Sequence, residues 1–156
     1  MQGLNSTSLD AGIRHAADLN LRGVNPWLGG SLEELSDAQA IVVVGSDPRN
    51  DQPLLTQRIR QVAKQGGKVV LVNSGGTDPL FPKATWLKVK PSELASALGS
   101  QAVSSALAIE GGPKFVLLGQ QALMSANANS VVANAQALAN ATGAKLGFLG
   151  DGANWV

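Results

Sequence analysis

The chain has 156 residues, of which 44% are hydrophobic and 15% charged, and its 12 Lys and Arg against 11 Asp and Glu give a formal net charge of +1. This length and composition predict one globular domain that buries enough surface to fold without disulfides or a metal. Because the charges nearly balance, no net basic field exists to hold a phosphate backbone, and nucleic acid is not expected as a partner.

Cysteine is absent from the chain, and His15 is its only histidine. The lack of thiols excludes a thiolate-held iron-sulfur cluster, a Cys-rich zinc site and a cysteine nucleophile within these residues. A single imidazole cannot form a histidine metal cluster, and no Gly-x-Ser-x-Gly elbow occurs, so no metal site and no catalytic residue is predicted. His15, beside Arg14, is interpreted as a surface or capping residue in preference to a pH-sensitive contact.

The longest apolar runs, such as residues 40–44 and 115–118, are far shorter than the roughly 20 residues needed to cross a bilayer. The first residues, 1–6, show no basic start followed by an apolar stretch, so no signal peptide is predicted. We therefore expect no direct membrane insertion and a reducing, cytosolic setting.

Residues 1–36 show no strong periodicity and are predicted to form an irregular lead-in that packs on a sheet edge. Near its end, the capping-box pattern Ser31-Leu32-Glu33-Glu34 predicts a short helix. Trp27 and Trp86 are expected to anchor irregular parts of the chain through a large buried area.

Four short apolar runs are typical of strands that are buried on both faces. Each begins near an Ala or Lys and ends at Gly or Asn, and they cover residues 40–45, 68–73, 114–119 and 145–150.

The segments between these runs have apolar residues at helical spacing. Leu55, Ile59 and Val62 share one face of a helix for which Asp51 is the expected N-cap and Pro53 a first-turn residue. Two further helices are predicted over residues 91–98 and 129–141, the second ending at Gly143.

Short strands that alternate with helices predict an α/β fold, a three-layer Rossmann-like domain with a mainly parallel sheet over residues 37–156. The polar, Ala-rich segment 99–113 is the expected joint between two half-sheets.

Ligands of open parallel sheets bind beyond the carboxyl ends of the strands, where the winding reverses. After the first strand, the backbone N–H groups of residues 45–49 could bind a phosphate at the start of the next helix. Asp47 and Asp51 would repel that anion, and capping and turn formation at the helix start explain why these two carboxylates are there. Neither a Walker loop nor a dinucleotide fingerprint is present, and the glycines of residues 147–152 are interpreted as a turn. We predict no cofactor-binding residue and regard the crevice as vestigial, its candidate residues being Gly45, Ser46, Asp47, Arg49, Asn73 and Lys90.

A basic group, Arg58, Arg60 and Lys64, is interpreted either as a docking patch or as a solvated helix face. No residues assemble a nucleophile, a base and an oxyanion hole. From chemistry alone, a scaffold or binding domain is predicted.

One series of segments follows a recognisable pattern: an apolar strand that ends in a Gly-Ser/Thr-Asn-Pro-like turn, a Pro-started helix with Arg-Ile-Arg, and a short strand before Pro91. The matching segments are 38–45, Ser46-Asp47-Pro48, Pro53-Leu54-Leu55, Arg58-Ile59-Arg60, Gly67-Lys68-Val69 and 86–93. This series resembles the domain shared by the molybdopterin oxidoreductases.

A further set of segments narrows the resemblance within that superfamily. They are Pro26-Trp27-Leu28-Gly29, residues 46–49, Gln52-Pro53-Leu54-Leu55 and Asp78-Pro79-Leu80-Phe81. With them, the chain is similar to the large iron-sulfur subunits of bacterial NADH:quinone oxidoreductases, or respiratory complex I. Residues 152–156 also resemble an Ala-Asn-Ser-Val-Gly motif of those subunits, with Trp155 in place of Ser.

The resemblance implies an excised fragment of a longer subunit whose iron-sulfur clusters are held elsewhere. Its implied partners are other peripheral-arm subunits, on the cytoplasmic side of the inner membrane. In active molybdopterin enzymes an Asp associated with the guanine part of the cofactor ends the second strand, where this chain has Asn73-Ser74. A noncatalytic structural domain is therefore expected.

Two alternatives remain open from the sequence. One is a cofactor-binding module of a true molybdopterin oxidoreductase, of the formate dehydrogenase or nitrate reductase type. The other is a free nucleotide-sensing or transferase domain with an unrelated sheet.

Overall fold

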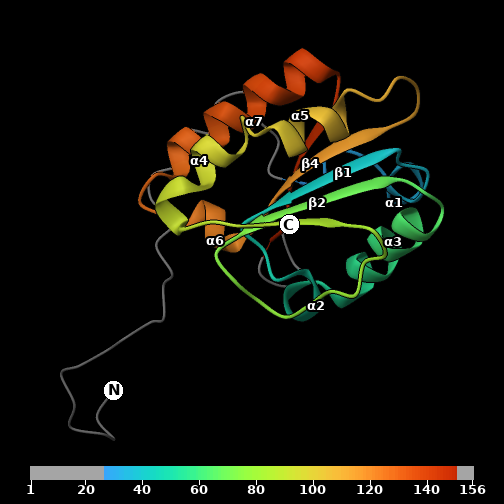
Figure 1. Ribbon diagram of the computed structural model, residues 1–156, viewed down its shortest axis with the longest axis horizontal. Coiled ribbons are helices and arrows are strands. Elements are labelled where there is room, and N and C mark those ends of the chain that lie inside the picture. Colours follow the sequence, from blue (N-terminus) through green and yellow to red (C-terminus); the bar gives the residue numbers. More distant parts are fainter. Residues whose placement is uncertain (1–26, 151–156) are drawn as a thin grey trace, which may run out of the picture.

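The computed structural model of the chain describes residues 27–150, which fold around a parallel sheet (Figure 1). Its five strands lie in the order β3-β2-β1-β4-β5, and every neighbouring pair is parallel. The strands are β1 (Ala40–Val44), β2 (Lys68–Asn73), β3 (Thr85–Lys88), β4 (Lys114–Leu118) and β5 (Lys145–Phe148). The predicted three-layer α/β fold is confirmed.

Helices cover both faces of the sheet (Figure 1). One face carries α1 (Leu32–Ser36), α2 (Pro48–Asp51) and α3 (Pro53–Lys64). The other carries α4 (Leu94–Ala97), which follows a turn of 3₁₀ helix (η1, Pro91–Glu93), α5 (Gln101–Leu107) and α7 (Ala128–Thr142). The short helix α6 (Gln120–Leu123) directly follows β4.

The central strand β1 is buried along its whole length because both of its faces are covered. Val42 and Val44 pack with residues of α4, α5 and α7, whereas Ile41 and Val43 pack with residues of α1 and α3. Side chains alternate between the faces of a strand, so these five apolar residues join two separate cores. This is why a continuous apolar run correctly predicted a strand.

The predicted capping box begins α1 as expected. Ser31 Oγ accepts from the Glu34 backbone N–H at 3.1 Å, and Glu34 Oε2 accepts from the Ser31 N–H at 2.9 Å. Gly143, in the left-handed region at φ +67°, ends α7 as predicted.

Residues 27–30 lie against β5, at the edge of the sheet. The Phe148 backbone N–H donates to the Trp27 carbonyl at 2.8 Å, and a Cβ built on Gly147 would lie 2.1 Å from the Leu28 carbonyl oxygen. The expectation that Trp27 is a buried anchor was wrong, because its side chain is 52% exposed and only its backbone holds the edge.

Three elements have no periodicity that would predict them from sequence. The strand β3, which the family resemblance implied before Pro91, is half-buried with the pattern exposed, intermediate, intermediate, exposed. The helices α2 and α6 have four residues each, too few for a helical repeat. The segment 99–113, the expected joint, contains α5 and leads from the β3 side of the sheet back to β4.

Asp51 was predicted to be the N-cap of α3, and this prediction was wrong. The cap position belongs to Gln52, which makes no side-chain capping bond there, and Asp51 ends α2 instead. The predictions for His15 and for residues 152–156 lie outside the described residues. No helix within residues 27–150 is long and apolar enough to span a membrane.

Candidate functional site

The candidate site lies where the carboxyl ends of β1, β2 and β4 meet. The chain leaves β1 toward β2 and β3 on one side, and β4 and β5 lie on the other, so the winding reverses between β1 and β4. Open α/β sheets bind ligands at this reversal. Gly45 and Ser46 follow β1 here, Asn73 ends β2, and Gly119 follows β4.

Backbone contacts fill the point of reversal. The N–H groups of Gln121 and Ala122 donate to the Gly45 carbonyl at 2.9 and 3.3 Å. Gly45 has φ +61°, and a Cβ built on it would lie 2.4 Å from the Ala122 nitrogen. A Cβ on Gly119 would lie 2.3 Å from Cβ of Ser46. The two glycines therefore allow the β1 and β4 ends to close on each other, with α6 packed above them.

Asn73 ties the end of β2 to that of β1. Its amide Nδ2 donates to the Ser46 carbonyl at 3.0 Å, and its Oδ1 accepts from the indole Nε1 of Trp86 on β3. The residue is only 2% exposed, so both ends of the amide are satisfied inside the protein. Its side chain holds three strands together and presents nothing to a ligand.

The two carboxylates beside β1 accept hydrogen bonds from the protein's own donors. Asp51 Oδ2 accepts from Ser46 Oγ at 2.9 Å and from the Asp47 backbone N–H at 2.7 Å. Asp47 Oδ2 accepts from Asn50 Nδ2 at 2.8 Å and from the Thr77 backbone N–H at 3.0 Å. These bonds hold the loops after β1 and β2 in place around the two carboxylates.

One acceptor in this cluster is left over. Asp47 Oδ1 is buried and has no hydrogen-bond partner among the described residues. As a carboxylate oxygen it attracts a donor or a cation, and it repels a phosphate oxygen.

The remaining two candidates lie further out. Arg49 Nη1 donates to the Asp78 carbonyl at 3.2 Å, so its guanidinium joins α2 to the loop after β2. Lys90 follows β3, and its backbone N–H donates to Glu93 Oε2 at 3.2 Å. Its side chain is exposed and forms no hydrogen bond or ion pair with the other five candidates. The structure thus joins Gly45, Ser46, Asp47 and Asn73 at the strand ends. Lys90 follows Val89, whose N–H donates to the Asn73 carbonyl at 3.0 Å, and has no side-chain bond to these four residues.

The basic group on α3 divides. Arg58 Nη1 donates to Ser36 Oγ of α1 at 3.3 Å, and Lys64 is exposed near the helix end. Arg60 is half-buried, with its Nε buried and without a hydrogen-bond partner among the described residues.

Within residues 27–150, no group of three or more His, Cys, Asp or Glu side chains is placed to hold a metal ion. The hydroxyl of Ser46 donates to a carboxylate and has no imidazole beside it among the described residues. The arrangement can hold three strand ends together, and the Ser46 hydroxyl that donates to Asp51 is buried, with the residue only 1% exposed.

The model of the molybdopterin oxidoreductase family matches residues 3–154. The chain belongs to the molybdopterin oxidoreductase family. The match covers nearly the whole sequence and includes every strand and helix described above. It places the chain in an oxidoreductase family, as the resemblance had implied.

A molybdopterin oxidoreductase binds a cofactor whose phosphates need free backbone N–H donors at such a strand edge. Here the Asp47 N–H donates to Asp51, the Thr77 N–H to Asp47, and the N–H groups of Gln121 and Ala122 to the Gly45 carbonyl. The carboxylates of Asp47 and Asp51 lie beside these donors and would repel a phosphate group. These residues are therefore poorly suited to hold the phosphates of such a cofactor.

Sequence reasoning missed Trp86, Thr77 and Ala122, which complete this closed arrangement. The available signals were a Trp in a short segment before Pro91 and glycines after two strands. Neither signal indicates which residue is contacted, because each contact joins residues that are far apart in the sequence.

Proposed function

We propose that this chain is a noncatalytic structural domain of the large iron-sulfur subunit of an NADH:quinone oxidoreductase. Membership of the family and the sequence resemblance to those subunits support the proposal. The observation that carries it is the closed strand edge, where Ala122 packs on Gly45 and Asn73 is bonded at both ends of its amide.

In this proposal the chain acts through rigidity. A parallel sheet covered on both faces and tied at its carboxyl edge resists deformation, which suits a platform for neighbouring subunits. The parent complex passes electrons from NADH to quinone through iron-sulfur clusters held by cysteines in other parts of the subunit. The proposed partners are other peripheral-arm subunits of complex I, on the cytoplasmic side of the inner membrane, and no cofactor is bound by this chain.

A second candidate is a cofactor-binding domain of a true molybdopterin oxidoreductase of the formate dehydrogenase or nitrate reductase type. The unpartnered Asp47 Oδ1 favours it, because a guanine base presents N–H donors that a carboxylate oxygen accepts. Against it, the Asp47 N–H, the Asn73 amide and the Thr77 N–H at this edge are already bonded within the protein.

Thermal unfolding with guanine nucleotides separates the two candidates. A ligand at 100 times its dissociation constant adds about 2.7 kcal/mol to the free energy of unfolding. For a chain of this size, that shift raises the melting midpoint by about 5 to 10 °C. The structural proposal expects no change with GDP or GTP at millimolar concentration. A saturable rise that is lost in Asp47→Ala would favour the cofactor-binding candidate.

A further inference from the structure

A hollow lies at the amino ends of the strands, where β2 and β3 begin, which is the end of the sheet opposite to the candidate site. It is a pocket of about 670 Å³, a size typical of small-molecule sites. Its walls come from the starts of β2 and β3, from the loop before β3 and from one side of α5. The lining residues are Lys68, Val69, Val70, Lys83, Thr85, Gln101, Ala102, Ser105 and Ala106.

The strand register explains why the pocket exists. Thr85, the first residue of β3, pairs with Val70, the third residue of β2. Lys68 and Val69 therefore extend beyond the start of β3, which leaves a notch at the sheet edge. The roof of the notch is α5, whose small side chains Ala102 and Ser105 leave space below them.

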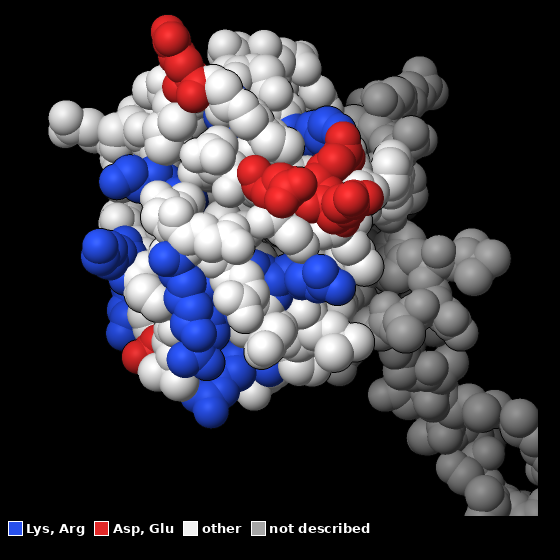
Figure 2. Space-filling model, turned by 90° about the vertical axis from the view of Figure 1, so that its right-hand side faces the viewer, with Lys and Arg blue, Asp and Glu red and all other residues white. Residues whose placement is uncertain are grey.

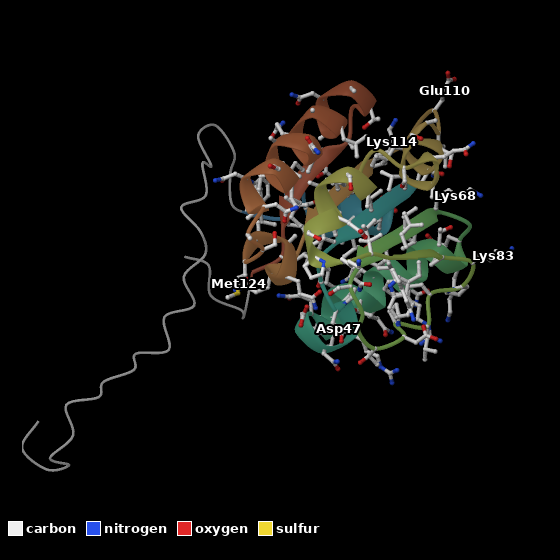
Figure 3. The ribbon with its side chains drawn as sticks, turned by 60° about the vertical axis from the view of Figure 1, so that its left-hand side comes forward. Asp47, Lys68, Lys83, Glu110, Lys114 and Met124 are labelled. Carbon is white, nitrogen blue, oxygen red and sulfur yellow. The ribbon has the colours of Figure 1, made fainter. Side chains whose placement is uncertain are left out.

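Both ionisable side chains at the pocket are cations. No Asp or Glu lines it, and the ammonium groups of Lys68 and Lys83 form no ion pair within residues 27–150. Figure 2 looks onto this edge of the sheet and shows most basic side chains gathered apart from most acidic ones. Figure 3 shows Lys68 and Lys83 at the same end of the molecule, with Met124 at the other. A hollow lined by one sign of charge concentrates the potential of that sign.

The backbone conformation at position 83 does not favour a lysine. Its φ is +59°, in the left-handed region, where Gly or Asn fits with less strain. A long cationic side chain is thus held at the rim at a conformational cost. Beside it the pocket offers the Thr85 hydroxyl and the Gln101 amide as hydrogen-bonding groups, and Ala102 as apolar surface. The Ser105 hydroxyl, which donates to the Ala102 carbonyl at 3.2 Å, remains available as an acceptor.

We propose that this pocket binds a small organic phosphate, a dianion with an apolar body. Lys68 and Lys83 would face the phosphate oxygens, Thr85 and Gln101 would donate hydrogen bonds, and the apolar body would lie on Ala102 of α5. The site is at the amino ends of the strands, away from the closed crevice, and the proposal does not depend on the proposed function.

The experiment is an NMR titration of the ¹⁵N-labelled 156-residue chain with phenyl phosphate at low salt, with benzyl alcohol as the uncharged comparison. We expect saturable shifts of the backbone amides of Lys68, Thr85 and Ser105, and none at Ser46 or Thr77. Added salt should weaken binding, because the attraction is electrostatic. The absence of saturable shifts at the pocket, or equal binding of benzyl alcohol, would overturn the proposal.

Three variants separate binding from folding. Lys83→Gly relieves the left-handed backbone while removing the cation, so it should weaken phenyl phosphate binding by about fivefold without lowering the urea midpoint. Lys68→Gln should weaken binding by a similar factor. Lys64→Gln, an exposed lysine that does not line the pocket, is the matched control and should leave binding unchanged. Equal binding by Lys83→Gly and the unchanged chain would contradict the assignment.

Discussion

Asn73 of β2 and Trp86 of β3 are joined side chain to side chain, the indole Nε1 donating to the amide Oδ1. The same amide donates from Nδ2 to the Ser46 carbonyl after β1. One residue thus links the edge strand, its neighbour and the central strand at the end of the sheet where related folds bind ligands. The two bonds use both ends of the Asn73 amide, which a carboxylate could not do because it lacks a donor.

Replacing that amide by a carboxylate tests the relationship. Asn73→Asp loses the Nδ2 donor and places a buried charge against the Ser46 carbonyl, so the free energy of unfolding should fall by about 2 to 3 kcal/mol. Urea denaturation measures this. Asn140→Asp, on the exposed side of α7, is the control and should change it by less than about 0.5 kcal/mol. Equal midpoints for both variants would show that the Asn73 bonds do not hold the strand ends.

The contact between Gly45 and Ala122 is tested by two alanine substitutions at glycines with positive φ. Gly66→Ala meets no atom within 4 Å and should cost about 1 kcal/mol, from backbone strain alone. Gly45→Ala also drives a Cβ into the Ala122 backbone, and should cost about 3 kcal/mol or more. If both variants lost the same stability in a denaturant titration, α6 would not be packed on the strand end.

Asp51 ends α2 and accepts hydrogen bonds from Ser46 and Asp47, so removing its carboxylate should weaken the structure at the start of this helix. Asp51→Ala leaves the Ser46 hydroxyl and the Asp47 backbone N–H without their acceptor, so we expect a loss of about 1 kcal/mol. Hydrogen exchange at the Asp47 amide should accelerate in the same variant. Asp37→Ala, an exposed residue at the end of α1, should have no such effect on that amide. Unchanged exchange at Asp47 would contradict the assigned bond.

The pair of Glu34 and Lys145 gives a pH dependence. Lys145 Nζ lies 2.6 Å from Glu34 Oε1, and this hydrogen bond, with that from the Ser31 N–H, lowers the pKa of Glu34 below its ordinary 4.5. Because the folded-state pKa is depressed, the pair stabilises the fold above pH 4.5, and the contribution is lost as the pH falls through the lower, folded value.

Glu34→Gln should therefore reduce the fall in stability between about pH 5 and more acidic conditions, as followed by thermal unfolding. The neighbouring Glu33→Gln, which leaves the bond between Glu34 and Lys145 in place, is the control. High salt should shrink the difference between the two variants, because both partners are about two-fifths exposed. A pH profile of Glu34→Gln identical to that of the unchanged chain would contradict the pairing.

The buried strands were predictable from sequence because burial on both faces leaves an uninterrupted apolar run, as in Ala40–Val44. The edge strand Thr85–Lys88 has no such run, since its outer side faces solvent, and only the family resemblance placed a strand there. Asp51 was misassigned because a Pro followed it at a suitable distance, and the sequence did not reveal the short helix α2 that intervenes.

The site was predictable only in part, for a related reason. Parallel strands bring their carboxyl ends to one edge, so Ser46, Asp47 and Asn73 could be grouped without a structure. Their bonding could not be, because it depends on Trp86, Thr77 and Ala122, which reach the edge through tertiary packing. Lys90 was grouped with them, but in the structure its side chain forms no hydrogen bond or ion pair with the other candidates.

The composition of the intact protein tests the proposed function most directly. The protein as it occurs in its native cells, tagged and purified together with whatever it is bound to, can be assayed for NADH:quinone oxidoreductase activity, iron and molybdenum. A structural domain of complex I predicts co-purifying NADH-dependent quinone reduction and iron, with no stoichiometric molybdenum. Stoichiometric molybdenum, with a guanine nucleotide released on denaturation and no NADH oxidation, would contradict the proposal.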